Sequence, residues 1–313
     1  MGGFAGQHLA ARLVKRGDDV IGVARGSVDW RLTELASSPR LSIRSGDLTS
    51  SEDCRRIVDL SEPDRIYLLA AMSSVSESFA DPLGAINNNV ACVVNVLEAA
   101  RHLESKPRSL VVASCEVYGR GGDDRLPFDE EAPLRPESPY AVSKVAIDLL
   151  GYEYHLTYGA HTVRVRPFNH IGPGQSDRFV SARFARQIAE CEAGLRPPII
   201  TVGNLDAERD FTDVRDIVAA YVDALESGKA GAAYNVGCGE TVSIRSLLDR
   251  LVARSRVPVE VREDPELLRP TDAPFQACDA TRLREQTGWR PRIPLDQTLD
   301  DILGYWRAQV AER

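Results

Sequence analysis

Cysteine and histidine are scarce in this sequence, and long apolar runs are absent from it. Its 313 residues include six cysteines and five histidines, with no Cys-x-x-Cys pair and no histidine at metal-ligand spacing from a cysteine. We therefore predict no metal site, and free thiols of the kind typical of a cytoplasmic protein. A membrane-spanning helix needs roughly 18 consecutive apolar residues, and no run approaches that length.

The charge balance excludes a further class of partner. Acidic side chains outnumber basic ones, and the net charge is −8. A nucleic-acid surface needs a basic patch or stripe with interleaved aromatic residues, and the sequence shows none. An anionic small molecule would therefore depend on a few local arginines.

What the sequence does contain is an alternation of apolar strands and amphipathic helices. In the first half, the pattern predicts helices at 5–16, 85–102 and 139–158. It predicts strands at 19–24, 41–45, 66–71, 109–114 and 162–166. This order predicts an α/β fold with a doubly wound parallel sheet of the Rossmann type. After residue 166 the rhythm breaks into loops rich in Gly and Pro. We therefore expect a dinucleotide-binding domain at 1–165 and a smaller, interwoven substrate lobe at 166–313.

The most informative residues are Ser114, Tyr140 and Lys144. Tyr140 and Lys144 are four positions apart in a predicted helix, so they lie on one face of it. A lysine ammonium beside a phenol stabilises the phenolate, so we predict that Lys144 lowers the Tyr140 pKa toward neutrality. Tyr140 would then act as a general acid or base, with the Ser114 hydroxyl bound to the oxygen that gains or loses the proton.

A second group of motifs completes a family resemblance. The motifs are Arg166-Pro-Phe-Asn169-His170-Ile-Gly-Pro-Gly-Gln175, Arg183-Phe-Ala-Arg186 and Arg209-Asp210-Phe211-Thr-Asp213. Together with the Ser, Tyr and Lys, they make the whole chain resemble the extended short-chain dehydrogenase/reductases (the NAD-dependent epimerase/dehydratase family), which modify nucleotide sugars with a nicotinamide cofactor. Within that family the chain looks most like the GDP-4-keto-6-deoxy-mannose reductases, and it is also similar to the GDP-mannose 4,6-dehydratases.

The opening of the chain departs from the family pattern. The resemblance implies a first strand ending in Gly-x-x-Gly-x-x-Gly, whose glycines let backbone amides approach the cofactor pyrophosphate. Gly3 and Gly6 match the second and third glycines, and with Phe4 they are predicted cofactor contacts. The first glycine would precede Met1. We therefore expect that the first strand is clipped from this sequence. The alternative, a protein that naturally lacks its central first strand, is disfavoured because it would have two exposed sheet edges and an opened core.

The resemblance implies further cofactor contacts near strand ends. Arg25 occupies the position where an arginine suits the 2′-phosphate of NADP and an acidic residue suits NAD, so NADP is favoured over NAD. Asp47 and Leu48 match the family's adenine contact, and Asn89 matches an asparagine with either a cofactor role or a structural one. The remaining predicted cofactor contacts are Leu69, Ala70, Ala71, Pro167 and His170, together with Tyr140 and Lys144.

The same resemblance implies substrate contacts and a fourth catalytic candidate. Asn169 and Arg209 are predicted to contact the substrate, Arg209 as a bidentate partner of its diphosphate. Arg183 and Ser114 are further candidates for substrate binding. Glu116 stands where related dehydratases carry a glutamate that removes and returns protons. Its presence leaves dehydratase chemistry open and does not establish it.

The implied reaction is the reduction of a GDP-4-keto-6-deoxy-hexose to a GDP-6-deoxyhexose, of the GDP-rhamnose type, by NADPH or NADH. Two alternatives stay open. One is a GDP-mannose 4,6-dehydratase or nucleotide-sugar 4-epimerase, which regenerates its cofactor in each cycle; the other is a catalytically silent nucleotide-binding regulator. The helices predicted at 85–102 and 139–158 are those that the family pairs into a dimer interface, so we also expect a homodimer.

Overall fold

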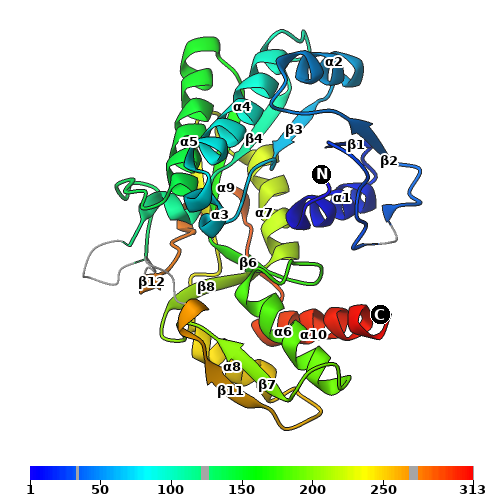
Figure 1. The fold of residues 1–313 in the computed structure, drawn as a ribbon. Coiled ribbons are helices and arrows are strands. Elements are labelled where there is room, and N and C mark those ends of the chain that lie inside the picture. The colour runs from blue at the N-terminus through cyan, green and yellow to red at the C-terminus, as the bar shows by residue number, and fades with distance from the viewer. Residues whose placement is uncertain (33–34, 121–126, 268–273, 313) are drawn as a thin grey trace.

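The computed structural model describes residues 1–32, 35–120, 127–267 and 274–312 (Figure 1). Its first part alternates helices and strands. In chain order these are α1 (Phe4–Arg16), β1 (Val20–Ala24), β2 (Leu41–Ser45), α2 (Ser51–Ser61), β3 (Arg65–Leu68), α3 (Val75–Ala80), α4 (Pro82–Arg101), β4 (Arg108–Val112), η2 (Cys115–Tyr118), α5 (Pro139–Tyr158) and β5 (Thr162–Pro167). η2 is a turn of 3-10 helix. Every helix and strand predicted for this half is present, with ends that differ by a few residues.

Local sequence fixes where the two 20-residue helices, α4 and α5, begin. Asp81 caps α4 by accepting a hydrogen bond from Gly84 N at 2.9 Å, and a proline fills the first turn. Ser138 caps α5 through Ala141 N at 3.1 Å, again with a proline in the first turn. Such caps satisfy amides that have no partner inside the helix. As a result, α5 holds Tyr140 in its first turn.

The strands of the main sheet pair in parallel, and the fold is a doubly wound α/β fold. One sheet has the order β3–β4–β5–β9, in which β9 (Ala233–Val236) comes from the second half of the chain. α4 and α5 pack on one face with α2 beside α4, and α7 (Val214–Ser227) packs on the other with α1 beside it (Figure 1). The central strands are therefore buried on both faces, which accounts for the apolar end of β4. β5 is also buried throughout, but it alternates Val163 and Val165 with the buried Arg164 and Arg166.

β1 and β2 form a separate parallel pair. Within the part of the chain that is described, no strand joins β1 to β3, and a cavity of about 510 Å³ lies between their edges. Apolar side chains of α1, α2 and α4 line it, including Leu9, Ile57 and Val96. The Met1 amine donates to Val23 O, on the edge of β1, at 2.6 Å. The sheet is thus open where the family pattern places its first strand.

The second half returns to the sheet and also builds a lobe of its own. Its further elements are β6 (Asn169–Ile171), α6 (Val180–Glu192), β7 (Ile199–Val202), β8 (Glu208–Asp213), β10 (Thr241–Ser243), α8 (Ile244–Val252), β11 (Glu260–Glu263), η3 (Pro265–Leu267), β12 (Phe275–Gln276), α9 (Thr281–Thr287) and α10 (Leu295–Ala311). β8 pairs with β6, β10 and β12, while β7 pairs with β11. Side chains of α7, β9 and α9 join the core around the main sheet, whereas α6, α8 and α10 enclose a second core.

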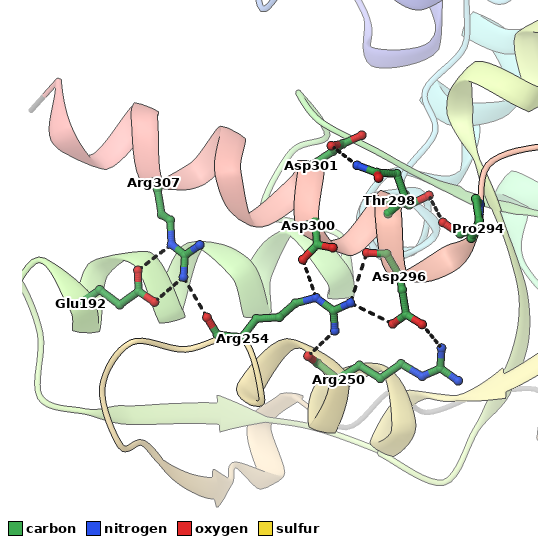
Figure 2. Close-up of polar contacts among 10 residues, drawn as sticks. Glu192, Arg250, Arg254, Pro294, Asp296, Thr298, Asp300, Asp301 and Arg307 are labelled. Carbon is green, nitrogen blue, oxygen red and sulfur yellow. Dashed lines mark hydrogen bonds and ion pairs between the residues drawn. The ribbon is translucent and has the colours of Figure 1, made fainter.

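Charged side chains hold the three helices of that second core together (Figure 2). Arg307 on α10 makes a bidentate pair with Glu192 of α6, both contacts at 2.7 Å, and also donates to Arg254 O at 2.9 Å. Arg254, just after α8, donates back to Asp300 and Asp296 of α10 at 2.7 and 2.9 Å. These contacts fix α10 against both α6 and α8.

Candidate active site

The three catalytic candidates meet at the carboxyl end of β4. Ser114 follows this strand and caps η2, where its Oγ accepts a hydrogen bond from Glu116 N at 3.2 Å. Tyr140 and Lys144 lie in the first turns of α5, and the Tyr140 phenol hydrogen-bonds Ser114. Lys144 Nζ donates to Val112 O, the last residue of β4, at 2.8 Å. The fold therefore brings together the three residues that the sequence pattern singled out.

Burial sets the proton affinities of this site. Tyr140 is only 8% exposed, and burial raises its pKa above the ordinary value of a phenol; the Ser114 hydrogen bond opposes the shift and the Glu116 charge adds to it. The prediction that Lys144 lowers the Tyr140 pKa toward neutrality is therefore wrong for the protein alone. Lys144 Nζ lies 5.7 Å from the centre of the Tyr140 ring, and burial lowers its own pKa to about 8.

The physical reason is that desolvation disfavours the charged form of both groups. The sequence predicts that the ammonium lies next to the phenol, but it does not show how completely the fold removes water from both groups. Tyr140 consequently holds its proton at neutral pH. That is the form a general acid needs.

The cofactor candidates at the start of the chain surround the N-terminus of α1. Gly3 is the N-cap residue, and no side chain caps the helix. A Cβ on Gly6 would lie 2.4 Å from Met1 O, so only glycine fits at that position. The Phe4 ring stacks on the His170 ring, with centroids 6.1 Å apart and 6° between the planes. A helix N-terminus without a side-chain cap suits a phosphate group.

Arg25 and Asp47 are neighbours beyond the ends of β1 and β2. Arg25 is exposed. Hydrogen bonds from Thr49 lower the pKa of the Asp47 carboxyl, and the Arg25 charge contributes to the same shift. Thr49 N and Oγ1 donate to Asp47 Oδ1 at 2.9 and 2.8 Å. Leu48 lies next to them and faces the cavity between β1 and β3.

Asn89 ties the segment that follows β3 to the catalytic helix. It is fully buried, its Nδ2 donates to Met72 O at 3.2 Å and to Ser143 Oγ at 2.8 Å, and its Oδ1 accepts from Met72 N at 2.7 Å. Ser143 lies on α5 beside the catalytic candidates, and the predicted contacts at 69–71 directly precede Met72. This arrangement favours the structural role for Asn89, because its side-chain atoms are used within the protein.

Pro167 and His170 lie at and just beyond the end of β5, near Lys144. Pro167 is buried. Burial lowers the pKa of His170, and the nearby Lys144 charge lowers it further. His170 Nδ1 lies 3.2 Å from Phe168 O, which fixes the orientation of the ring that stacks on Phe4.

The predicted substrate residues come from three elements of the second half. Asn169 Oδ1 on β6 is buried and has no hydrogen-bond partner among the described residues. Arg209 on β8 lies close enough to Cys115 for its charge to act on that thiol, which places it near Ser114. Arg183 on α6 donates through Nε to Asp177 O at 3.3 Å.

Two features of the site have no counterpart in the sequence predictions. His8 lies edge-on to Phe4, with ring centroids 5.4 Å apart, and its Nε2 is 2.9 Å from Pro173 O. Asp148 follows Lys144 by four residues on the same face of α5 and is fully buried. The sequence signal that could have found both is a spacing of four residues along a helix: His8 follows Phe4 by four residues, and Asp148 follows Lys144 by four. No group of three or more metal-ligating side chains occurs in the described part of the chain.

The chain matches one protein family over nearly its full length. The family is described as GDP-mannose 4,6 dehydratase, and the match covers residues 1–302. A GDP-6-deoxy-D-mannose reductase of Pseudomonas aeruginosa is 39% identical over 250 residues, which are 80% of this chain and 82% of that protein. A GDP-mannose 4,6-dehydratase of Sinorhizobium fredii is 28% identical over 92% of this chain and 89% of its own.

Solved structures agree with these sequence matches. The structure of RMD from Pseudomonas aeruginosa complexed with NADPH aligns with a TM-score of 0.84 and 34% identity, covering 98% of this chain and 96% of that one. A UDP-glucose 4-epimerase of Thermus thermophilus in complex with NAD aligns with a TM-score of 0.86 and 27% identity over 98% and 96% of the two chains.

Proposed function

The chain belongs to the GDP-mannose 4,6-dehydratase family of NAD(P)-dependent nucleotide-sugar oxidoreductases, and we propose that it reduces a GDP-4-keto-6-deoxy-hexose to a GDP-6-deoxyhexose. The product is of the GDP-rhamnose type. The observation that carries this proposal is the assembly of Ser114, Tyr140 and Lys144 at the end of β4. The reductase relative shares more identity with the chain than the dehydratase relative does, which favours reduction over dehydration.

In the proposed reaction Tyr140 is the general acid and Ser114 binds the reacting oxygen. A bound nicotinamide cofactor would supply the hydride that reduces the 4-keto carbon. Negative charge then develops on the keto oxygen, and hydroxyl donors aimed at that oxygen lower the barrier. Tyr140 gives this oxygen its proton. Lys144, held by Val112 O, is assigned to orient the nicotinamide ribose and to supply positive charge beside Tyr140.

The residues around α1 fit a dinucleotide. The helix N-terminus without a side-chain cap at Gly3, and the close backbone approach at Gly6, suit a pyrophosphate. We assign NADP to this site in preference to NAD because Arg25 lies exposed beyond β1, and because the reductase structure described above contains NADPH. On this assignment residues 1–165 form the dinucleotide-binding domain and residues 166–313 supply most substrate contacts.

The GDP-sugar is assigned to the side of β6, α6 and β8. The buried Asn169 Oδ1 without a partner is a polar atom that a sugar hydroxyl would satisfy. Arg209 and Arg183 are assigned to the diphosphate and to the rest of the nucleotide, because a guanidinium binds phosphate oxygens in a bidentate manner.

Cofactor choice can be tested at Arg25. We expect Arg25→Ala to weaken NADPH binding by about 10- to 100-fold, since a charge-assisted hydrogen bond contributes roughly 1.5–3 kcal/mol, and to leave NADH binding nearly unchanged. Titration of both cofactors by fluorescence measures this. Arg55→Ala, on the exposed surface of α2, is the matched control. Equal loss of both cofactors, or no loss of either, would contradict the assignment of Arg25 to the 2′-phosphate.

A dehydratase remains the second candidate because of one specific contact. The Glu116 carboxylate lies near enough to Tyr140 to raise the phenol pKa, so a potential base stands beside the acid. A dehydratase would convert GDP-mannose without net use of cofactor. The distinguishing assay follows NADPH absorbance with GDP-4-keto-6-deoxy-mannose or GDP-mannose as the substrate. Reduction predicts consumption of NADPH with the keto sugar and no reaction with GDP-mannose.

The proposed assembly is a homodimer formed through α5. Four large apolar side chains on one face of this helix are 42–64% exposed: Val142, Leu149, Tyr152 and Leu156. A continuous apolar stripe of this kind is typical of an interaction surface. A second copy of the chain would cover it with its own α5.

We expect Leu149→Glu combined with Leu156→Glu to convert the dimer to a monomer, because the charges would be buried in the interface. Size-exclusion chromatography with light scattering measures the mass. Leu195→Glu is the control, since Leu195 is 60% exposed but lies beyond the end of α6. A monomeric native protein, or a double variant that stays dimeric, would rule out this interface.

We also propose a cytoplasmic location. All six cysteines are free, and five of them are buried. In addition, none of the helices in the described ranges has the length and apolar character needed to cross a membrane.

A further inference from the structure

The catalytic helix carries a third polar side chain on the face that holds Tyr140 and Lys144. Asp148 follows Lys144 by one helical turn and is fully buried. Its carboxylate accepts from Arg166 Nε and Nη2 at 3.1 and 2.8 Å and from Arg164 Nη1 at 2.7 Å. Both arginines belong to β5 and are less than 10% exposed. Buried ion pairs between Asp148 and the two arginines therefore connect α5 to β5.

Arg166 extends this network to the segment that carries Ser114. Its Nη1 donates to the Tyr118 hydroxyl at 2.9 Å and to Glu130 O at 3.0 Å. Tyr118 is fully buried and is the last residue of η2, the turn that begins next to Ser114. The Tyr118 hydroxyl in turn donates to Asn235 Oδ1 on β9 at 2.7 Å.

The free-energy cost of burying charges argues that this network does more than stabilise the folded protein. A buried ion pair repays its desolvation only with good geometry, and well-packed apolar replacements are often as stable or more stable. What the network does provide is fixed geometry, since each member has several directional contacts. η2 is a short turn whose apolar side chains pack in the main core and whose Val117 O accepts from Arg135 N at 2.9 Å. Apolar packing has no directional preference, so the directional contacts of Tyr118 are the ones suited to set the distance from η2 to α5.

We propose that Asp148, Arg166 and Tyr118 act as positioning residues that set the distance between Ser114 and Tyr140. Asp148 fixes the helix that holds Tyr140, Tyr118 fixes the turn that holds Ser114, and Arg166 joins the two. The two hydroxyls must converge on one oxygen of the substrate. Misplacement by about 1 Å can cost roughly 100-fold in rate. This inference rests on the proposed reduction, in which both hydroxyls contact that oxygen.

Tyr118→Phe is the test variant, because it deletes one hydroxyl and keeps the packed ring. We expect kcat for the keto sugar to fall about 10- to 100-fold, with KM and NADPH affinity nearly unchanged. The matched control is Tyr154→Phe. Tyr154 is a buried tyrosine of the same helix, and its hydroxyl donates to Glu98 Oε1 at 2.7 Å, away from η2.

A double-mutant cycle separates positioning from a general loss of structure. In a Ser114→Ala background the hydroxyl to be positioned is absent, so Tyr118→Phe should cause little further loss of kcat. A purely structural effect would lower kcat by the same factor in both backgrounds, and that result would overturn the inference. So would a Tyr118→Phe enzyme with the same kcat as Tyr154→Phe.

The native enzyme is measured alongside these variants. Absence of keto-sugar reduction by the native enzyme would refute the proposed function itself. Reduction by the native enzyme with no difference between the two tyrosine variants would refute only the positioning role.

Discussion

Tyr140→Phe is expected to lower turnover of the keto sugar by about 10²- to 10⁴-fold, the usual contribution of a general acid. The phenol is buried, hydrogen-bonded to Ser114 and protonated at neutral pH, so it can donate the proton that the proposed reduction requires. Phenylalanine keeps the ring and its packing. Binding of NADPH and of GDP-sugar should therefore change little.

The measurement is steady-state turnover together with calorimetric binding of both ligands. Tyr154→Phe, on the same helix, controls for loss of a buried hydroxyl as such. Near-normal turnover by Tyr140→Phe would exclude Tyr140 as the acid. Loss of turnover together with loss of binding would indicate a structural defect.

Lys144→Met is expected to inactivate the enzyme and at the same time to stabilise the protein without ligand by about 2 kcal/mol at pH 7. Burial lowers the Lys144 pKa from 10.5 to about 8. Each pKa unit corresponds to about 1.4 kcal/mol, so the buried charge opposes folding by about 3 kcal/mol at neutral pH. Loss of the hydrogen bond to Val112 O offsets this gain by roughly 1 kcal/mol.

The sign of the pH dependence follows from proton binding. Between pH 8 and 10.5 the unfolded chain binds more protons at Lys144 than the folded chain does, so the free energy of unfolding rises with pH across this window. The methionine variant lacks this rise, and its stability advantage should disappear toward pH 10.5. Urea unfolding at pH 7 and pH 10 measures both effects.

Lys15→Met, at an exposed position of α1, is the control and should change neither stability nor its pH dependence. A Lys144→Met protein less stable than the native one at pH 7 would show that the lysine stabilises the fold. Such a trade of stability for function is common where a site requires a buried polar group.

The parts of the structure that could be predicted from sequence depend on local patterns. Alternating apolar periods placed the helices and strands of the first half, including the helix predicted at 139–158, which is α5. Parallel strands bring their carboxyl ends to one edge of the sheet. For that reason Ser114 after β4 meets the residues of α5.

The parts that could not be predicted depend on burial and on contacts between distant residues. Desolvation sets the direction of the Tyr140 pKa shift, and the spacing of residues along the sequence gives no information about desolvation. The role of Asn89 became visible only through its contacts with Met72 and Ser143. The link from Asp148 through Arg166 to Tyr118 joins three segments that no single motif contains.

The most direct test of the proposed reduction is the fate of the hydride. NADPH deuterated at the transferable position of nicotinamide C4 is incubated with the native enzyme and GDP-4-keto-6-deoxy-mannose, and the product is examined by mass spectrometry and NMR. Reduction predicts one deuterium at sugar C4 and one equivalent of NADPH consumed per product. An unlabelled product, or conversion of GDP-mannose to a keto sugar without consumption of NADPH, would contradict it.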